Sequence, residues 1–472
     1  MELRFRNTLT GEIEPFEPIE EGKVGLYHCG PTVYARPHIG NHRAFLFADL
    51  LRRVLEYAGF EVTQVMNLTD VGHLTDDADE GEDKLEKRAR REKIDPWDLV
   101  EKVSESFFTD LASLAVMPAH HYPRATGHIP EMLEMVCALI EKGNAYQVGE
   151  DVYFHVPSFA KYGRLSGNKV DNLEAGARLE VNPDKKHPSD FALWKSDPDH
   201  LMKWESQFGP HGFPGWHIEC SAMSRKYLGD RFDIHTGGED NIFPHHECEI
   251  AQTEALIEKS WVSTWMHTRF LQVDGGKMSK SVGNVWTLDD VQERGFSPLD
   301  FRFFVLRTHY RGAMNFTWEA LKGAAEARRN LADFKGRLEA SAHGAVNEGV
   351  CARIDEAREL FQAALAEDLN ASAALAVLFD LRSDFLQGDL KTAEEASAAL
   401  SFLLEVDGVF GFLGPDEGII SLSDEEVESL IAEREEARQS KNFQRADELR
   451  ASLMEAGIVL EDVAEGIRWH RI

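Results

Sequence analysis

Residues 23–70, KVGLYHCGPTVYARPHIGNHRAFLFADLLRRVLEYAGFEVTQVMNLTD, decide the fold class. Residues 23–29 form a short apolar segment typical of a strand, and the residues that follow are rich in Gly and Pro. Apolar side chains then recur at the spacing of a helix as far as Gly59, and residues 61–70 favour a second strand. A strand, a helix and a second strand form a βαβ unit, which predicts a parallel sheet with helices on its faces.

Polar and cysteine side chains gather where these predicted elements meet. Cys29 ends the first strand, Pro37–Asn41 (PHIGN) lead into the helix, and Asn67–Asp70 end the second strand. Ligands bind to such sheets at the carboxyl ends of the strands. We therefore expect the three segments to surround one crevice.

The composition is that of an ordinary globular chain. Of 472 residues, 43% are hydrophobic and 28% are charged, which excludes a disordered chain. At about 150 residues per domain, the length predicts roughly three domains. Five Cys residues are too few for a disulfide scaffold, the first residues lack the apolar segment of a signal peptide, and no apolar run is long enough to cross a bilayer. We therefore expect a cytoplasmic protein with no membrane partner.

The charge balance limits the partners. A formal net charge of −31 argues against non-specific binding to nucleic acids or anionic lipids. A specific RNA partner is still compatible with this charge, because affinity depends on local basic faces rather than on the total.

Two short motifs suit a nucleoside triphosphate. In the first, His38 and Asn41 stand at the predicted start of a helix, where free N–H groups and the helix dipole attract phosphate. Both side chains can donate to a transferring phosphoryl group, and Gly40 lets a base approach the backbone. On its own, this motif is more typical of a turn with a capping Asn.

The second motif is Lys277–Ser281 (KMSKS), which glycines flank on both sides. Lys277 and Lys280 supply positive charge for the β- and γ-phosphates, Ser279 supplies a hydroxyl, and the glycines allow the loop to close. A polar surface loop would have the same composition, but the two motifs together favour an ATP site.

A third set of residues has the donor atoms of a zinc site. Cys29, Cys220, His245 and Glu249 offer two thiolates, an imidazole and a carboxylate, and the last two share a helix face at i, i+4. On spacing alone, buried structural cysteines and an exposed helical His explain these residues better. Cys248, beside Glu249, is either a thiol that points away or an alternative soft ligand.

Longer stretches of the sequence match a known family. The two motifs around the βαβ unit resemble those of class I aminoacyl-tRNA synthetases, whose usual first motif is His-Ile-Gly-His. Asn41 departs from that pattern, since it keeps a donor but cannot become cationic. The stretches CGPTVY, NLTDV, GWHIECSAM, FPHHECEIAQ and ADELRASLMEAGIVLED resemble the cysteinyl-tRNA synthetase family, and the resemblance extends from about residue 2 to the C-terminus.

The resemblance implies an α/β fold: a Rossmann-like class I catalytic core with an insertion, a helical-bundle anticodon-binding region and a small C-terminal mixed domain. The late ATP loop is expected at the end of the core. The expected ranges are 1–115 and 220–285 for the core, 116–219 for the insertion, 286–317 for a stem-contact region, 318–412 for the bundle and 421–472 for a small anticodon-recognition domain.

The resemblance also implies ligation of L-cysteine to tRNA(Cys) through a cysteinyl-adenylate, with ATP, Mg²⁺ that arrives with ATP, and one Zn²⁺ per chain. Cys29, Cys220, His245 and Glu249 match the family's zinc ligands, and the substrate thiolate is an added ligand. A sulfur atom bound to zinc separates cysteine from serine, which an apolar pocket does poorly.

Further residues are carried over from the family. The amino-acid pocket is expected to contain Cys29, Gly30, Thr69, Trp216 and His245. The expected catalytic residues are His38, Asn41, Lys277 and Lys280. ATP is expected to bind His38, Gly40, Asn41, Asp240, Lys277, Ser279 and Lys280, with Asp240 on the ribose hydroxyls.

The C-terminal third has residue types that contact RNA. Arg438, Lys441 and Arg445 line one face of a predicted helix, and Trp469 can stack on an unstacked anticodon base. A surface helix held by ion pairs would have the same composition, since acidic residues share the region. The resemblance favours anticodon contact through a local basic face, and a monomer.

Three alternatives fit part of the sequence. A related cysteine ligase of mycothiol synthesis activates cysteine identically but lacks the extended C-terminal module. A zinc-stabilised RNA-binding protein has no need of the KMSKS loop. A zinc hydrolase would require a Glu base in an H-E-x-x-H arrangement, which HHECE does not have.

Overall fold

The computed structural model describes most of the chain. The described residues are 1–72, 83–168, 182–278, 283–342, 352–388, 392–414, 424–439, 442, 445–446, 449–450, 453, 458–463 and 466–471.

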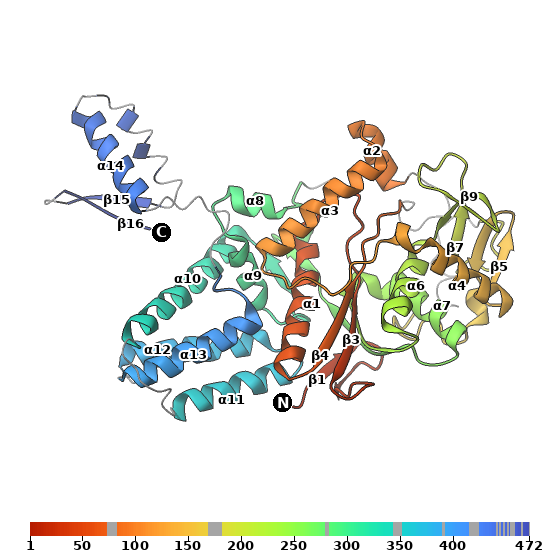
Figure 1. The fold of residues 1–472 in the computed structure, drawn as a ribbon, viewed down its shortest axis with the longest axis horizontal. Helices are drawn as coiled ribbons and strands as arrows, with labels where there is room; N and C mark the ends of the chain where they lie inside the picture. Colours follow the sequence, from red (N-terminus) through yellow and green to blue (C-terminus); the bar gives the residue numbers. More distant parts are fainter. Residues whose placement is uncertain are drawn as a thin grey trace.

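A four-stranded parallel sheet forms the centre of the protein (Figure 1). In the order β11-β10-β3-β4, its members are β3 (Lys23–His28), β4 (Glu61–Met66), β10 (Phe232–Gly238) and β11 (Val262–Thr268). Helix α1 (Ile39–Tyr57) connects β3 to β4, which pair along their whole length. The predicted βαβ unit and parallel sheet are therefore confirmed.

Helix α1 is buried on most sides, because apolar residues cover more than one of its faces and the core surrounds it. The residues at the predicted helical spacing are all buried: Phe45, Leu46, Leu50, Leu51 and Leu55. The helix ends at Tyr57 with Ala58 as its C-cap, and Gly59 follows with a φ of 96°, a conformation that favours glycine.

The chain between β4 and β10 forms helices and a second sheet. The helices are α2 (Lys84–Glu92), α3 (Pro96–Ser113), α4 (Ile129–Glu141) and α6 (Trp216–Leu228). The antiparallel sheet, in the order β5-β6-β7-β9-β8, contains β5 (Ala145–Val148), β6 (Asp151–Phe154), β7 (Phe191–Ser196), β8 (Trp204–Ser206) and β9 (Gly209–Pro214). Helix α6 packs on β3 and β4, so the boundary expected between residues 219 and 220 falls inside this helix.

Smaller elements complete the part of the described chain around the central sheet. They are β1 (Arg4–Asn7), β2 (Glu12–Pro15), α7 (Glu247–Ile257), β12 (Leu271–Val273), β13 (Gly276–Lys277), α8 (Leu288–Glu293), α9 (Pro298–Leu306) and β14 (Met314–Phe316). Strands β12 and β13 form a hairpin, and β14 pairs in parallel with β12.

The remainder of the described chain is mostly helical. The bundle contains α10 (Trp318–Ser341), α11 (Ala352–Ala366), α12 (Ala371–Gln387) and α13 (Ala393–Phe410). Helix α14 (Asp424–Gln439) and a hairpin of β15 (Ile458–Val463) and β16 (Gly466–Arg471) follow. Figure 1 shows the bundle and the five-stranded sheet on opposite sides of the central sheet.

The bundle and the central sheet share one apolar core, which includes side chains of α1, α9, α10 and α13. Arg302 of α9 is buried there and donates to Asp49 Oδ2 at 2.6 Å and to the carbonyls of Leu114 and Phe410 at 2.9 and 2.5 Å. These bonds fix the bundle against α1 and α3.

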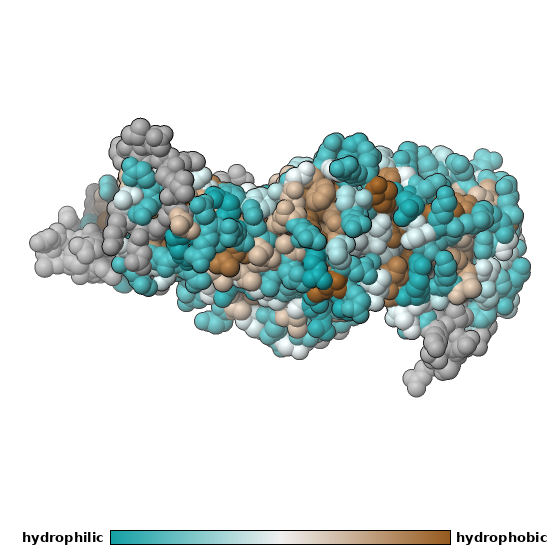
Figure 2. Space-filling model, turned by 90° about the horizontal axis from the view of Figure 1, so that it is seen from below, coloured by the Kyte–Doolittle hydropathy of each residue, from teal (hydrophilic) through white to brown (hydrophobic). Residues whose placement is uncertain are grey.

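The face seen in Figure 2 is mainly hydrophilic, with smaller hydrophobic patches between polar residues. Within the described part of the chain, no helix is both long and apolar enough to span a membrane.

Candidate active site and metal centre

A cavity of about 450 Å³ opens at the carboxyl ends of β3, β10 and β11. Its lining includes residues from each predicted motif: Cys29, Gly30, His38, Gly40, Asn41, Trp216, Asp240 and Lys277. Asn67, which follows β4, reaches the same place, because its Oδ1 accepts from the Gly30 N–H at 2.9 Å. The cavity therefore lies where ligands of parallel sheets bind.

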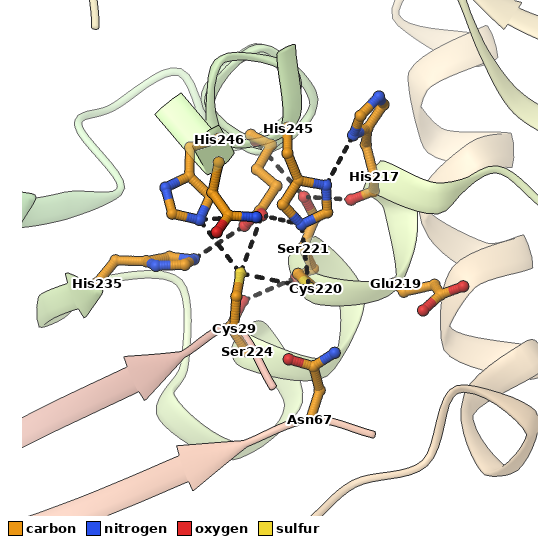
Figure 3. Close-up of polar contacts among 12 residues, drawn as sticks. Cys29, Asn67, His217, Glu219, Cys220, Ser221, Ser224, His235, His245 and His246 are labelled. Carbon is orange, nitrogen blue, oxygen red and sulfur yellow. Dashed lines mark hydrogen bonds and ion pairs between the residues drawn. The ribbon is translucent and has the colours of Figure 1, made fainter. Parts of the chain in front are cut away.

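Two cysteines, a histidine and a glutamate converge beside this cavity, which Cys29 also lines. Figure 3 shows Cys29, Cys220 and His245 of this group close together. Cys29 follows β3, Cys220 lies on α6, His245 lies in the turn before α7, and Glu249 lies in the first turn of α7. The two sulfur atoms are 4.0 Å apart, and His245 Nε2 lies 3.6 Å from Cys220 Sγ. His245 Nε2 also lies 2.9 Å from Glu249 Oε1, and all four candidate ligand atoms lie within 4.8 Å of one another.

This donor set fits Zn²⁺. Zinc prefers four Cys, His or carboxylate ligands in a tetrahedron, with Zn–S bonds of about 2.3 Å. Two such bonds at the tetrahedral angle place the sulfur atoms about 3.8 Å apart. The 4.0 Å between Cys29 Sγ and Cys220 Sγ is close to that separation, so the ligand cage is nearly formed.

Further histidines orient two of these side chains. His217 Nδ1 lies 2.9 Å from Nδ1 of His245, and His235 Nε2 lies 3.0 Å from Glu249 Oε2. A metal-binding imidazole or carboxylate is commonly held by such an outer hydrogen bond, which sets its orientation.

His246 plays the same part for Cys29. Its Nε2 lies 3.2 Å from Cys29 Sγ, and its Nδ1 lies 2.8 Å from Nε2 of His267. Cys29, His235, His246 and Glu249 form a second, overlapping group that meets the same 4.8 Å limit. The sequence analysis did not identify these outer histidines, although His217 lies within GWHIECSAM and His246 within FPHHECEIAQ.

The buried cluster is strongly polarised. Burial opposes the ionisation of Glu249, but interactions with His235 and His245 lower its pKa to about 2. Burial opposes protonation of His245, but Glu249 and Cys220 raise its pKa to about 10. Burial raises the pKa of Cys29, whereas a hydrogen bond from Cys29 lowers that of Cys220. The negative groups produce the field that attracts a cation.

His38 and Asn41 cap the N-terminus of α1. The His38 ring accepts from the Asn41 N–H at 3.2 Å, and Asn41 Oδ1 accepts from the His38 N–H at 3.1 Å. Asn41 thus caps the helix and also lines the cavity. A Cβ at Gly40 would lie 2.2 Å from Met278 Cε, so a larger residue here would displace the end of the Met278 side chain.

The late motif is only partly described. Lys277 lines the cavity at the end of β13, and its Nζ lies 5.7 Å from the centre of the Phe270 ring. Ser279 and Lys280 lie outside the described residues.

Arg43 of α1 holds the base of the hairpin that carries Lys277. The buried guanidinium donates to the carbonyls of Phe270, Tyr310 and Gly312 at 2.7, 3.1 and 2.7 Å. Sequence reasoning missed this role, for which the only signal is a charged residue within an apolar helix.

The other residues expected in the pocket differ in whether they line the cavity. Asp240 lines the cavity, and burial raises its pKa. Trp216 lines it too, with its ring centre 4.5 Å from that of His245. Thr69 lies behind the lining, is buried, and donates to Glu219 Oε2 at 2.8 Å.

Cys248 lies apart from the candidate ligands. It is buried, its Sγ lies 3.5 Å from the Tyr162 hydroxyl, and it belongs to neither of the groups around Cys29. The structure therefore favours the thiol that points away.

Two of the predicted RNA-contacting residues form ion pairs. Arg438 pairs with Glu435 at 3.1 Å, and Arg445 pairs with Glu433 at 2.9 Å. Lys441 and the side chain of Trp469, on β16, lie outside the described part of the chain.

Comparisons with known proteins identify the fold. A model of the class I (C) tRNA synthetase catalytic domain matches residues 15–326, and a DALR domain matches residues 360–414. Methionyl-tRNA synthetase of Mycobacterium tuberculosis with methionyl-adenylate superposes with a TM-score of 0.63, at 14% identity over 82% of this chain and 92% of that chain. An Agrobacterium radiobacter LeuRS in a ternary complex superposes with a TM-score of 0.61, at 12% identity over 84% of each chain. The fold is therefore that of the class I aminoacyl-tRNA synthetases.

Sequence relatives identify the family within the class I aminoacyl-tRNA synthetases. The model of the cysteinyl-tRNA ligase anticodon binding domain matches residues 423–469. The chain is 45% identical to a cysteine–tRNA ligase of Thermus thermophilus, over 99% of each chain. It is 44% identical to that of Symbiobacterium thermophilum over 100% of each chain. The chain belongs to the cysteinyl-tRNA synthetase family, which confirms the resemblance.

Proposed function

We propose that this chain ligates L-cysteine to tRNA(Cys) in an ATP-dependent reaction. The observation that carries the proposal is the convergence of Cys29, Cys220, His245 and Glu249 beside a cavity lined by the first ATP motif. A soft-metal ligand set and a helix N-terminus suited to phosphate share one site, so a thiol and ATP can be held together.

We infer that these four side chains hold one Zn²⁺. When bound, zinc supplies a soft Lewis acid that prefers a thiolate to the hydroxyl of serine. The chain itself keeps the ligands in place, through the contacts of His217 with His245 and of His235 with Glu249. Cysteine is then distinguished from serine without an editing domain.

In the first step, the carboxylate of cysteine attacks the α-phosphate of ATP, which forms cysteinyl-adenylate and releases pyrophosphate. The N-terminus of α1, capped by His38 and Asn41, offers N–H groups and the helix dipole to the phosphates. Lys277 stabilises the leaving pyrophosphate, and Lys280 and Ser279 are proposed to join it. Mg²⁺ enters with ATP. Catalysis rests on positioning and charge stabilisation, with no covalent enzyme intermediate.

Asp240 is proposed to hold the ribose hydroxyls of ATP. In the second step, a hydroxyl of the terminal tRNA ribose attacks the carbonyl carbon of the adenylate, and AMP leaves. Residues 286–317 are proposed to contact the tRNA stem.

Residues 421–472 are proposed to read the anticodon. The proposed contacts are Arg438, Lys441, Arg445 and Trp469. The ion pairs of the two arginines are exposed and therefore weak, so phosphate groups can replace their acidic partners. We propose that the protein works as a monomer in the cytoplasm.

Transfer of labelled cysteine to tRNA, with and without ATP and with serine as competitor, tests the function. We expect ATP-dependent charging that excess serine does not reduce. Cysteine-dependent pyrophosphate exchange without tRNA charging would instead identify a mycothiol-type ligase. Absence of any cysteine activation would contradict the proposal.

A further inference from the structure

A directed chain of hydrogen bonds lies behind the amino-acid pocket. The Thr69 hydroxyl donates to Glu219 Oε2 at 2.8 Å, Asn67 Nδ2 donates to Thr69 Oγ1 at 3.1 Å, and the Gly30 N–H donates to Asn67 Oδ1 at 2.9 Å. A backbone N–H only donates, which orients the Asn67 amide so that its Nδ2 donates to Thr69 and leaves the Thr69 proton for Glu219. The direction of every bond is therefore fixed. The chain therefore ends at Gly30, which lines the cavity beside Cys29.

Glu219 is placed to supply negative potential rather than to bind the metal. It is fully buried on α6, next to Cys220, and its carboxylate points away from the sulfur atoms (Figure 3). Asp70 is buried nearby: burial raises its pKa, and the charge of Glu219 raises it further. Two carboxylates therefore stand behind Thr69.

The cavity lining by itself does not suit a cation. Among its described residues, Asp240 is the one carboxylate, and it is proposed for the ATP ribose. Arg269 and Lys277 make the lining positive, as ATP requires. An amino acid held by its thiol beside Cys29 still carries an ammonium group, which needs an acceptor and negative potential.

We propose that Glu219 is the positioning residue for the substrate ammonium and acts through Thr69. Because the proton of the Thr69 hydroxyl is committed to Glu219, Thr69 can only accept, and its remaining lone pair selects a donor such as an ammonium. Thr69 adjoins the lining, since its backbone forms a bridge with that of Thr32, which lines the cavity. The inference deepens the proposed function and rests on it.

Three thiol ligands distinguish a specific effect of Glu219 on the substrate ammonium from a general effect on the structure of the pocket. L-cysteine carries an ammonium and a carboxylate, cysteamine carries the ammonium only, and 3-mercaptopropionate carries the carboxylate only. Glu219→Gln keeps the volume and an acceptor for Thr69 but removes the charge. We expect the zinc-loaded variant to bind L-cysteine and cysteamine about 10- to 100-fold more weakly in calorimetric titrations. Binding of 3-mercaptopropionate should change less than twofold.

Two further comparisons test whether Glu219 acts on the ammonium through Thr69. Thr69→Val should reproduce the ammonium-specific loss, and Thr69→Ser, which keeps the hydroxyl, should restore binding. Glu254→Gln is the matched control, because Glu254 is a buried carboxylate on α7 that pairs with Arg164 at 2.8 Å. It should not alter the ratio of the three affinities.

Equal weakening of all three thiols in Glu219→Gln would overturn the inference, as would unchanged binding of all three. Either result would leave the proposed function standing if the wild-type protein binds L-cysteine. Wild-type protein that fails to bind L-cysteine would refute the proposed function itself.

Discussion

Replacement of Arg43 by methionine tests how α1 controls the late ATP loop. Arg43 is buried, and its guanidinium donates to the carbonyls of Phe270, Tyr310 and Gly312 within 3.1 Å. Phe270 directly precedes β12, so these bonds fix the β12–β13 hairpin that carries Lys277. Arg43→Met retains much of the side-chain volume and removes every donor.

The expected loss of stability follows from two opposing terms. The Tyr310 carbonyl keeps donors from Thr268 Oγ1 and the Arg269 N–H, so the carbonyls of Phe270 and Gly312 are the two that lose theirs. A carbonyl left without a donor costs about 1–3 kcal/mol, which gives about 4 kcal/mol for two at the middle of the range. Burial opposes the charge of Arg43 and lowers its pKa to about 10, so removing the charge recovers about 3 kcal/mol at 1.36 kcal/mol per pKa unit. The net loss of unfolding free energy should be about 1 kcal/mol.

Urea denaturation and pyrophosphate exchange measure the two consequences. We expect Arg43→Met to raise the KM for ATP about tenfold, because the hairpin is no longer fixed against α1. Arg53→Met is the matched control: Arg53 is on the same helix and donates to the carbonyls of Ala115 and Gly408, away from the hairpin. It should lower stability and leave the KM for ATP unchanged. An Arg43→Met protein with wild-type stability, or with an unchanged KM for ATP, would refute the reasoning.

Three further predictions address other parts of the molecule. Cys220→Ser replaces a soft ligand and should reduce the zinc retained on dialysis roughly tenfold or more. Cys248→Ser should retain the zinc, and metal analysis of the two dialysed variants measures the difference. His200 is buried, which lowers its pKa, but Asp83 raises it above 6.5 overall. The stability that His200 contributes is therefore complete below pH 6.5 and is lost as the pH rises through the higher folded-state pKa. The urea midpoint should fall between pH 6 and pH 9 in the wild type and fall less in His200→Gln; equal falls would contradict this. Trp469→Ala should lower kcat/KM for tRNA charging about 10- to 100-fold through lost stacking, with pyrophosphate exchange unchanged. Equal losses in both assays would argue against anticodon contact.

The central sheet could be predicted from sequence because its signals are local. The apolar segment 23–29, the helical spacing that ends at Gly59 and the following strand all lie within residues 23–70. The five-stranded sheet was harder to predict, since β6 pairs with β7 across about 40 residues of intervening chain. Short β-like segments are visible there, but their pairing is set by tertiary packing.

The residues of the candidate site likewise fall into those that the sequence predicted and those that it did not. The ATP motifs and the metal ligands could be named from short stretches that resemble a family, but only the fold brings Cys29 close to Cys220. Arg43 was missed because it donates to backbone carbonyls of distant segments, which carry no sequence signal. Glu219 was missed because only the fold brings it to Thr69, which lies 150 residues earlier in the sequence.

The central claim is that the thiol of the substrate binds at the cage formed by Cys29, Cys220, His245 and Glu249. The most direct measurement is the absorption spectrum of the Co²⁺-substituted protein during titration with L-cysteine and, separately, with L-serine. The account predicts that thiolate-to-cobalt charge-transfer absorption increases with L-cysteine, saturates at one equivalent per chain, and does not change with L-serine. A spectrum that L-cysteine leaves unchanged, in protein that still charges tRNA, would contradict it.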